Sequence, residues 1–411
     1  MATTRAETRT SSWCRGRTSG GLLKGRVGPP RAGFHIDTRR RRICRCGVAG
    51  LASIACCGWG VEEVNSGAVN GANGRFPFTP FPRGWFFFEL SMNLPVGRLV
   101  SRQWLGQPAI AWRDEGGRVC IANAYCPHLG AKLAPESGGT VRNGNLVCSF
   151  HGFTYDTTGA CVSTPFVEPN PACRLRVFPC EEINGFVFGY FDERGTEPGW
   201  RLPDMDEAGW TETLTHVYSV RTHPQETSEN VIDLSHLSFL HGFDGVAHSG
   251  KIDIDGPCFK TDFRFDGRYN YPLLRRVENE LEAEVQIWGL GFLFVDTVSK
   301  SLGARTRNWF LATPVDGDRV DILVSAKVQA LNDGGIKGLN RLPRRLRERV
   351  MLPLVMYEFK KNIENDFMIW ENKTYREYPL LNEADGEILK FRRYCTQFYP
   401  EPDQGLTSAS T

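Results

Sequence analysis

Short apolar runs separated by Gly, Asn and Pro fill the chain from about Phe76 to Phe191. Examples are "GRLVSRQWLG", "GNLVCSFHGFTYD" and "INGFVFGYFD". Apolar runs of this length, bounded by turn-forming residues, are typical of β-strands. The pattern therefore predicts an all-β domain over 76–192, followed by a polar, Pro- and Gly-rich linker over 193–215.

The second half of the chain has a different pattern. "PQETSENVIDLSHLSFLHGF" has helical apolar spacing with a Thr or Ser cap, and "LNRLPRRLRERVMLPLVMYEFKKNIENDFMIWENK" predicts one or two long helices. Between them, "EAEVQIWGLGFLFVDTV", "RTRNWFLATPV" and "DRVDILVSAKVQA" predict strands. We expect an α+β domain over 216–400, with helices against an antiparallel sheet.

The two ends of the chain differ from the rest in composition. The first 74 residues carry twelve Lys or Arg but only four Asp or Glu. Four of the basic residues form the run Arg39–Arg42. No periodic apolar pattern accompanies these charges, so we expect 1–75 to be a disordered leader and not a nucleic-acid-binding element. The segment resembles a transit peptide or an export signal. Alternatively, the start codon is misassigned and the segment is never translated. We expect 401–411 to be a disordered tail.

No run of about 18 apolar residues occurs in the chain, which predicts no stable membrane span. We expect the protein to be cytoplasmic, or to reside in a plastid or another organelle if 1–75 is a transit peptide.

One stretch combines cysteine and histidine in a way that indicates a metal. The chain has thirteen cysteines and eight histidines, and "YCPHLGAKLAPESGGTVRNGNLVCSFHGF" contains C-x-H followed by C-x-x-H. These residues are Cys126, His128, Cys148 and His151. Such a set can hold tetrahedral zinc, or a [2Fe–2S] cluster with two cysteines on one iron and two histidines on the other.

The surroundings favour the cluster. Gly130 and Gly152 follow the two pairs and would let the backbone approach the cluster sulfides. The segment "GACVSTP" is placed to cover it as a third loop. Zinc fingers of this composition usually place their histidines on a helix, and no helix is predicted here.

A second group of candidate ligands lies in "ENVIDLSHLSFLHGF". Asp233 and His236 share a helical face. His241 lies five residues after His236, roughly 140° from a full helical turn, so a regular helix would not aim both imidazoles at one atom. A bend, an irregular turn or a helix end at Gly242 would bring them together. Asn230, one turn before Asp233, would face the same pocket.

Two imidazoles and one carboxylate form the facial triad of non-haem Fe(II) oxygenases, which leaves open positions on the metal. The carboxylate has to come from elsewhere in the chain. Our choice is Asp366 in "IENDFMIWENK", with Glu364 and Glu371 as alternatives.

Together these motifs resemble the Rieske non-haem iron oxygenases. "CPHLG" and "CSFHGFTYD" match the cluster motif, and E-N-x-x-D-x-x-H-x-x-x-x-H with a distant D-x-x-I-W matches the catalytic domain. The resemblance implies one [2Fe–2S] cluster and one mononuclear Fe(II) per chain, and a helix-grip-like catalytic domain. It also implies that Asp233 bridges the cluster of one subunit to the iron of the next in a homotrimer.

The same resemblance implies O₂ as a substrate and a ferredoxin and/or NAD(P)H-dependent flavin reductase as the electron donor. "YCPHLGA" and "DFMIWENK" are most similar to the group that contains 3-ketosteroid 9α-hydroxylases and cholesterol 7-desaturases. We therefore expect a terminal oxygenase that hydroxylates or desaturates a bulky apolar substrate such as a steroid or sterol. Alternatives are an oxygenase of chlorophyll-type tetrapyrroles, a non-enzymatic Rieske electron carrier and a zinc module.

Overall fold

The computed structural model describes residues 74–269, 277–331 and 339–400. The expected leader, apart from its last two residues, and the expected tail lie outside this part of the chain. Arg75, assigned to the leader from sequence, already belongs to the fold, because Nη1 donates hydrogen bonds to the carbonyls of Trp370 at 2.9 Å and Lys373 at 3.2 Å. In the described ranges, no helix combines the length and apolar character that crossing a bilayer requires.

The first part of the chain consists of three antiparallel sheets, with strand orders β1–β11–β10, β2–β3–β4–β9 and β5–β6–β7–β8. Their bounds are β1 Gly84–Leu90, β2 Leu99–Trp104, β3 Gln107–Arg113, β4 Val119–Asn123, β5 Thr140–Arg142, β6 Asn145–Val147, β7 Thr154–Tyr155, β8 Cys161–Ser163, β9 Val177–Phe178, β10 Cys180–Ile183 and β11 Phe186–Phe191.

Aromatic side chains build the core between these sheets. Trp104 is fully buried, and its indole N–H donates to the carbonyl of Phe87 at 3.2 Å. A Cβ at Gly189, in the middle of β11, would come within 2.8 Å of the Trp104 ring. The glycine in "FVFGYF" is therefore required by the indole packed on that strand.

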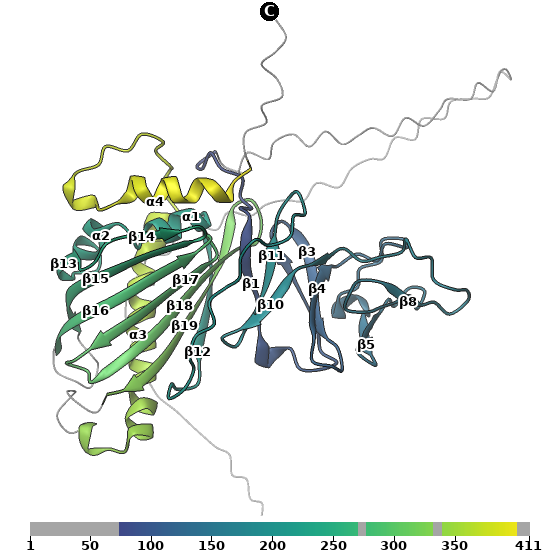
Figure 1. Ribbon diagram of the computed structural model, residues 1–411, viewed down its shortest axis with the longest axis horizontal. Coiled ribbons are helices and arrows are strands. Elements are labelled where there is room, and N and C mark those ends of the chain that lie inside the picture. The colour runs from purple at the N-terminus through teal and green to yellow at the C-terminus, as the bar shows by residue number, and fades with distance from the viewer. Residues whose placement is uncertain (1–73, 270–276, 332–338, 401–411) are drawn as a thin grey trace, which may run out of the picture. The chain divides into compact units, whose positions relative to one another are not determined.

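The second part of the chain is one large antiparallel sheet with helices, in the strand order β12–β19–β18–β17–β16–β15–β13, with β14 paired to β15 (Figure 1). The strands are β12 Leu214–Arg221, β13 Asp244–His248, β14 Asp253–Asp255, β15 Cys258–Tyr269, β16 Val277–Trp288, β17 Phe292–Ser299, β18 Ala304–Pro314 and β19 Arg319–Ala330. The helices are α1 Pro224–Glu229, α2 Leu234–Phe239, α3 Arg344–Trp370 and α4 Ile388–Cys395.

The long helix α3 runs across this sheet (Figure 1). It is one helix of 27 residues that contains Pro353, and the preceding Leu339–Arg341 forms a separate 3₁₀ turn. Ile363, Asp366 and Trp370 are buried at helical spacing, and the Trp370 ring lies 6.1 Å from that of Phe310 on β18. The expected fold class, an all-β domain followed by an α+β domain, is confirmed.

Candidate metal centres

The two Cys/His pairs lie in loops with the same backbone hydrogen bonds. In the first, Cys126 N–H donates to the Ala131 carbonyl at 2.8 Å and Gly130 N–H donates to the Cys126 carbonyl at 2.9 Å. In the second, Cys148 N–H donates to Phe153 at 2.8 Å and Gly152 N–H to Cys148 at 3.0 Å. Each loop thus reverses four residues after its cysteine.

The glycines close these loops through their backbone conformation. Gly130 has φ 72° and Gly152 has φ 70°, the left-handed region that only glycine adopts without cost. A Cβ at Gly152 would also lie 2.8 Å from Pro165, because the "GACVSTP" segment packs against this loop as expected.

The four side chains converge at the loop tips. Both thiols are buried, and the His128 and His151 rings lie 4.9 Å apart between centroids. Burial raises the pKa of the Cys126 thiol, so a thiolate there needs a compensating positive charge. Nδ1 of His151 is buried and has no hydrogen-bond partner among the described residues, which a metal bond would satisfy. The donor set and its surroundings fit a [2Fe–2S] cluster.

Tyr155 adds a contact that the sequence motifs did not identify. Its hydroxyl lies 3.0 Å from Cys126 Sγ and 3.5 Å from Cys173 Sγ. Burial raises the pKa of the Tyr155 phenol, so it stays protonated and donates to a thiolate at Cys126. The Tyr in "HGFTYD" was visible in the sequence, but its distance from Cys126 depends on strand pairing.

Residues 224–243, which contain His236 and His241, do not form the single helix that their apolar spacing predicted. They form α1 and α2, with the break at residues 230–233. His223 caps α1 and Asp233 caps α2, so the expected Thr or Ser cap is wrong. Asp233 Oδ1 accepts hydrogen bonds from the N–H groups of Ser235 and His236. These bonds start a new helix at Leu234, so the chain does not continue α1 through residue 233.

This break orients the first imidazole. His236 Nδ1 donates to the Asp233 carbonyl at 2.6 Å, which leaves Nε2 as the acceptor nitrogen. Asn230 Nδ2 lies 3.0 Å from that Nε2 and donates to it. Burial lowers the pKa of His236, although Asp366 and Asp233 oppose the effect. The ring is therefore neutral near pH 7, the form that binds a metal.

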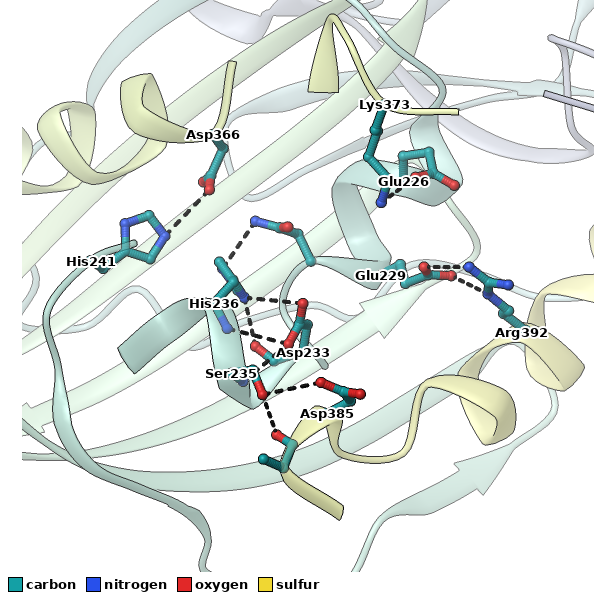
Figure 2. Close-up of polar contacts among 12 residues, drawn as sticks. Glu226, Glu229, Asp233, Ser235, His236, His241, Asp366, Lys373, Asp385 and Arg392 are labelled. Atoms are coloured by element: carbon teal, nitrogen blue, oxygen red, sulfur yellow. Dashed lines mark hydrogen bonds and ion pairs between the residues drawn. The ribbon is translucent and has the colours of Figure 1, made fainter. Parts of the chain in front are cut away.

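His241 and Asp366 lie beside His236 and complete the second group of candidate ligands (Figure 2). Helix α2 ends at Phe239, and the chain turns at Gly242 with φ 71°, which brings the His241 ring to 5.1 Å from that of His236. His241 Nε2 lies 3.4 Å from Asp366 Oδ1. One ligand atom each from His236, His241 and Asp366 all lie within 4.8 Å of one another, a donor set that fits mononuclear Fe(II).

The two alternative carboxylates point elsewhere. Glu364 is exposed and accepts a hydrogen bond from Tyr218 at 2.6 Å, and Glu371 is exposed just beyond the end of α3. Among the three candidates, only Asp366 is buried and joins the histidines.

Two ion pairs connect buried carboxylates of α1 to residues near the C-terminal end of the chain (Figure 2). Glu229 accepts two hydrogen bonds from Arg392 of α4, at 2.7 and 2.8 Å. Glu226 forms an ion pair with Lys373 at 2.6 Å. Sequence reasoning missed these partners, because they come from segments far apart in the chain.

An apolar cavity of about 250 Å³ opens beside the three candidate ligands. The sheet, α2 and α3 wall it, with Phe263, Leu293 and Phe310 among its lining residues. Asn230 also lines it, as expected. A largely apolar pocket next to a metal site is typical of an enzyme that acts on an apolar molecule.

Comparison with known proteins identifies the class. Residues 84–179 match the model of the Rieske [2Fe-2S] domain, and 189–399 match that of the 3-ketosteroid 9alpha-hydroxylase C-terminal domain. The chain is 30% identical to a cholesterol 7-desaturase of Ciona intestinalis (80% of this chain, 71% of the relative) and 29% to that of Caenorhabditis elegans (78% and 77%). It is 24% identical to a 3-ketosteroid-9-alpha-monooxygenase oxygenase component of Rhodococcus rhodochrous (78% and 80%).

Solved structures share the fold. Dicamba monooxygenase bound to dicamba superposes with a TM-score of 0.54 at 16% identity, covering 78% of this chain and 98% of that one. Caffeine-bound NdmA of Pseudomonas putida CBB5 gives 0.55 at 17% identity, covering 78% and 90%.

These matches define a Rieske-type oxygenase. The chain belongs to the family of Rieske oxygenases whose catalytic domain is of the 3-ketosteroid 9α-hydroxylase type. It is an oxidoreductase that uses a [2Fe–2S] cluster and a mononuclear iron, with an electron-transfer partner, a substrate and O₂. The zinc-module and electron-carrier alternatives are thereby set aside.

Replacing Arg392 with Met should destabilise the protein by about 3–5 kcal/mol, because it leaves the Glu229 carboxylate buried without a partner. Urea unfolding of the wild type and the variant measures the difference. Arg349→Met, at an exposed position of α3, is the control and should cost less than about 0.5 kcal/mol. Equal stability of the two variants would show that the ion pair does not support α1.

Proposed function

We propose that Cys126, His128, Cys148 and His151 hold the Rieske cluster. The two loops with matching hydrogen bonds, the buried thiols and the unpaired Nδ1 of His151 support this assignment. The His128 ring is exposed and stacks on Phe153 with 4.2 Å between ring centroids, so as a cluster ligand it would offer a path for an electron between the surface and the cluster.

For the mononuclear iron we propose His236, His241 and Asp366 as ligands. The convergence of their ligand atoms within 4.8 Å is the observation that carries this assignment. When bound at these two sites, the cluster supplies electrons and the iron supplies the oxidation of substrate by O₂.

The protein's own residues prepare the iron site. The Asp233 carbonyl holds His236 in the tautomer that leaves Nε2 for the iron. Asn230 Nδ2 lies 3.0 Å from this same Nε2, so the amide would give up that hydrogen bond when the metal binds. The apolar cavity keeps water from the substrate and strengthens the attraction between carboxylate and metal. We propose that Asn230 acts from the cavity wall beside the iron.

Tyr155→Phe should lower the reduction potential of the cluster by roughly 40 mV, if the lost hydrogen bond favours the reduced state by about 1 kcal/mol. The added electron makes the sulfur ligand more negative, and the Tyr155 hydroxyl stabilises that charge. Spectroscopic redox titration measures the change. Tyr190→Phe, a buried tyrosine of β11, is the matched control and should leave the potential unchanged.

We propose that the substrate is a sterol or steroid, which the enzyme hydroxylates or desaturates. The apolar cavity supports this, as do relatives that are cholesterol 7-desaturases and 3-ketosteroid 9-alpha-monooxygenases. The alternative substrate, a chlorophyll-type tetrapyrrole, carries several polar and charged edge groups, which the Phe and Leu lining does not match.

Purified enzyme with a reductase, NAD(P)H and O₂ should convert cholesterol or a ketosteroid to an oxidised product that mass spectrometry detects. His241→Ala should abolish turnover and lower the iron content from about three to about two atoms per chain, while the visible spectrum of the cluster remains. Turnover of a chlorophyll-type tetrapyrrole but of no sterol would overturn the substrate assignment. Unchanged iron content in His241→Ala would overturn the ligand assignment.

We propose that the active form is a homotrimer in which Asp233 carries electrons from the cluster of one subunit toward the iron of the next. The Asp233 side chain is 30% exposed although it caps α2, so a neighbouring chain can reach it. Large apolar side chains are exposed near both ends of this path: Leu129 and Phe150 on the cluster loops, and Phe239 on α2. Such residues are typical of an interface.

Co-expression of a cluster-deficient chain (Cys148→Ser) with an iron-deficient chain (His241→Ala) should restore about a quarter of wild-type turnover. In randomly mixed rings, about one contact in four joins an intact cluster to an intact iron site. Asp233→Asn in both chains should abolish this restoration while the iron content is kept, because Asn still caps α2. No restoration in mixed oligomers would show that electrons pass within one chain.

We propose that the electron donor is a ferredoxin and/or an NAD(P)H-dependent flavin reductase. We also propose that the enzyme works in the cytoplasm. The exposed His128 edge of the cluster supports docking of such a donor.

A further inference from the structure

Two cysteines that the proposed metal sites do not use lie opposite each other beside the cluster loops. Ala160 and Arg174 form an isolated antiparallel bridge, so the neighbouring residues Cys161 and Cys173 also face each other across the two segments. Cys161 N–H donates to the Cys173 carbonyl at 3.2 Å, in agreement with this register. Directly opposed residues extend their side chains from the same face of a sheet, so the two thiols lie on one side.

This arrangement suits a disulfide bond. Residues at a hydrogen-bonded position of an antiparallel pair have Cα atoms about 5.5 Å apart. Disulfides bridge Cα atoms that lie about 4.4–6.8 Å apart. The two thiols already influence each other, because burial raises the pKa of Cys161 and the neighbouring Cys173 adds to the rise. Both residues are only partly buried, so a small oxidant in solution can reach them.

Tyr155 connects this pair to the proposed cluster ligand Cys126. Its hydroxyl lies 3.0 Å from Cys126 Sγ and 3.5 Å from Cys173 Sγ. A phenol has one hydrogen to donate, and a thiolate at Cys126 is the stronger acceptor. In the second contact the Cys173 thiol is therefore the donor and the phenol oxygen the acceptor. A hydroxyl that accepts a hydrogen bond donates a stronger one, so Cys173 strengthens the bond to Cys126.

We propose that Cys161 and Cys173 form a reversible disulfide that lowers the reduction potential of the cluster. The inference rests on the proposed assignment of Cys126 as a cluster ligand and goes beyond it. A disulfide sulfur carries no hydrogen, so oxidation removes the donor to Tyr155 and weakens the bond from Tyr155 to Cys126. The added electron makes the Cys126 sulfur more negative, so a weaker bond there stabilises the reduced cluster less.

The oxidant is a small-molecule disulfide such as oxidised glutathione. One protein thiolate attacks a glutathione sulfur, the S–S bond of glutathione breaks, and a mixed disulfide and one reduced glutathione result. The second protein thiolate attacks the mixed disulfide, which forms the Cys161–Cys173 bond and releases a second reduced glutathione. The two protein sulfurs thus lose two electrons to the two glutathione sulfurs, which also take up the two thiol protons. An excess of a dithiol reverses both steps.

The first measurement detects the bond itself. The cluster-loaded enzyme is incubated with oxidised glutathione without O₂ at a pH of about 8.5, because the raised pKa of Cys161 leaves little thiolate at neutral pH. Free thiols are alkylated in denaturant, and chymotrypsin then cleaves after Phe166, between the two cysteines. We expect mass spectrometry to find the two peptides joined in most wild-type chains and separate after treatment with dithiothreitol. Separate peptides in oxidised wild type would overturn the proposal.

The second measurement is the cluster potential, by spectroscopic redox titration without thiols. Oxidised wild type should have a lower potential than reduced wild type. The shift should be smaller than that expected for Tyr155→Phe, because the Tyr155 bond is weakened and not removed. The oxidant should leave the potential of Tyr155→Phe unchanged, since that variant lacks the connecting hydroxyl. Equal potentials of oxidised and reduced wild type would overturn the switch.

Two alanine variants separate the disulfide from the loss of the thiol donor. Cys161→Ala cannot form the bond but keeps the Cys173 thiol, so its potential should equal that of reduced wild type with or without oxidant. Cys173→Ala lacks the donor in both conditions, so its potential should be low in both. Cys258→Ala, at a partly buried cysteine of β15, is the matched control and should respond as wild type does. Equal potentials of Cys161→Ala and Cys173→Ala would overturn the link through Tyr155.

Cys126→Ala tests the cluster assignment separately. Loss of the visible spectrum of the cluster in this variant supports Cys126 as a ligand. Loss of that spectrum, together with equal potentials of oxidised and reduced wild type, overturns the switch alone. An unchanged cluster in Cys126→Ala overturns the ligand assignment, and the switch that acts through Cys126 with it.

Discussion

The contact between His241 and Asp366 sets the main constraint on this protein. A carboxylate and an imidazole lie 3.4 Å apart, with side chains only 4% and 7% exposed, at the edge of an apolar cavity. Desolvation at such a place is costly unless the groups are paired or bind a cation. A metal relieves that cost, and the surrounding architecture must hold its ligands in position before it binds.

Several features of the catalytic domain follow from this requirement. Helix α2 has only six residues and ends before His241, so that a turn can bring the second imidazole back toward the first. Helix α3 crosses the sheet and brings Asp366 from a distant part of the chain. The buried pair Glu229–Arg392 joins α1 to α4 and fixes the segment that leads into the histidines. Polar interactions thus position the site, and apolar packing isolates it.

The cluster loops meet a similar requirement at a smaller scale. Each loop reverses at a glycine in the left-handed conformation, and both cysteines are buried while His128 reaches the surface. The raised pKa of the buried Cys126 thiol favours a bound cluster over a free thiolate, and the exposed imidazole of His128 would allow electron exchange. Both candidate metal sites place buried ligand atoms beside apolar side chains.

Local sequence determined much of this protein. Alternating apolar runs, turn residues and the spacing of Cys126, His128, Cys148 and His151 are short-range signals, so the fold class and the candidate cluster ligands could be predicted from the sequence. The need for a bend, an irregular turn or a helix end after His236 also followed from the helical angle alone.

What only the tertiary structure decided depends on pairs that are distant in sequence. The choice of Asp366 over Glu364 became clear only when α3 was packed on the sheet, because both lie on the same helix two residues apart. The split of one predicted helix into α1 and α2 follows from the Asp233 cap, and Arg392 is found only through its contact with Glu229. Side-chain identity and local spacing carry the chemistry, but the packing of remote elements decides which groups meet.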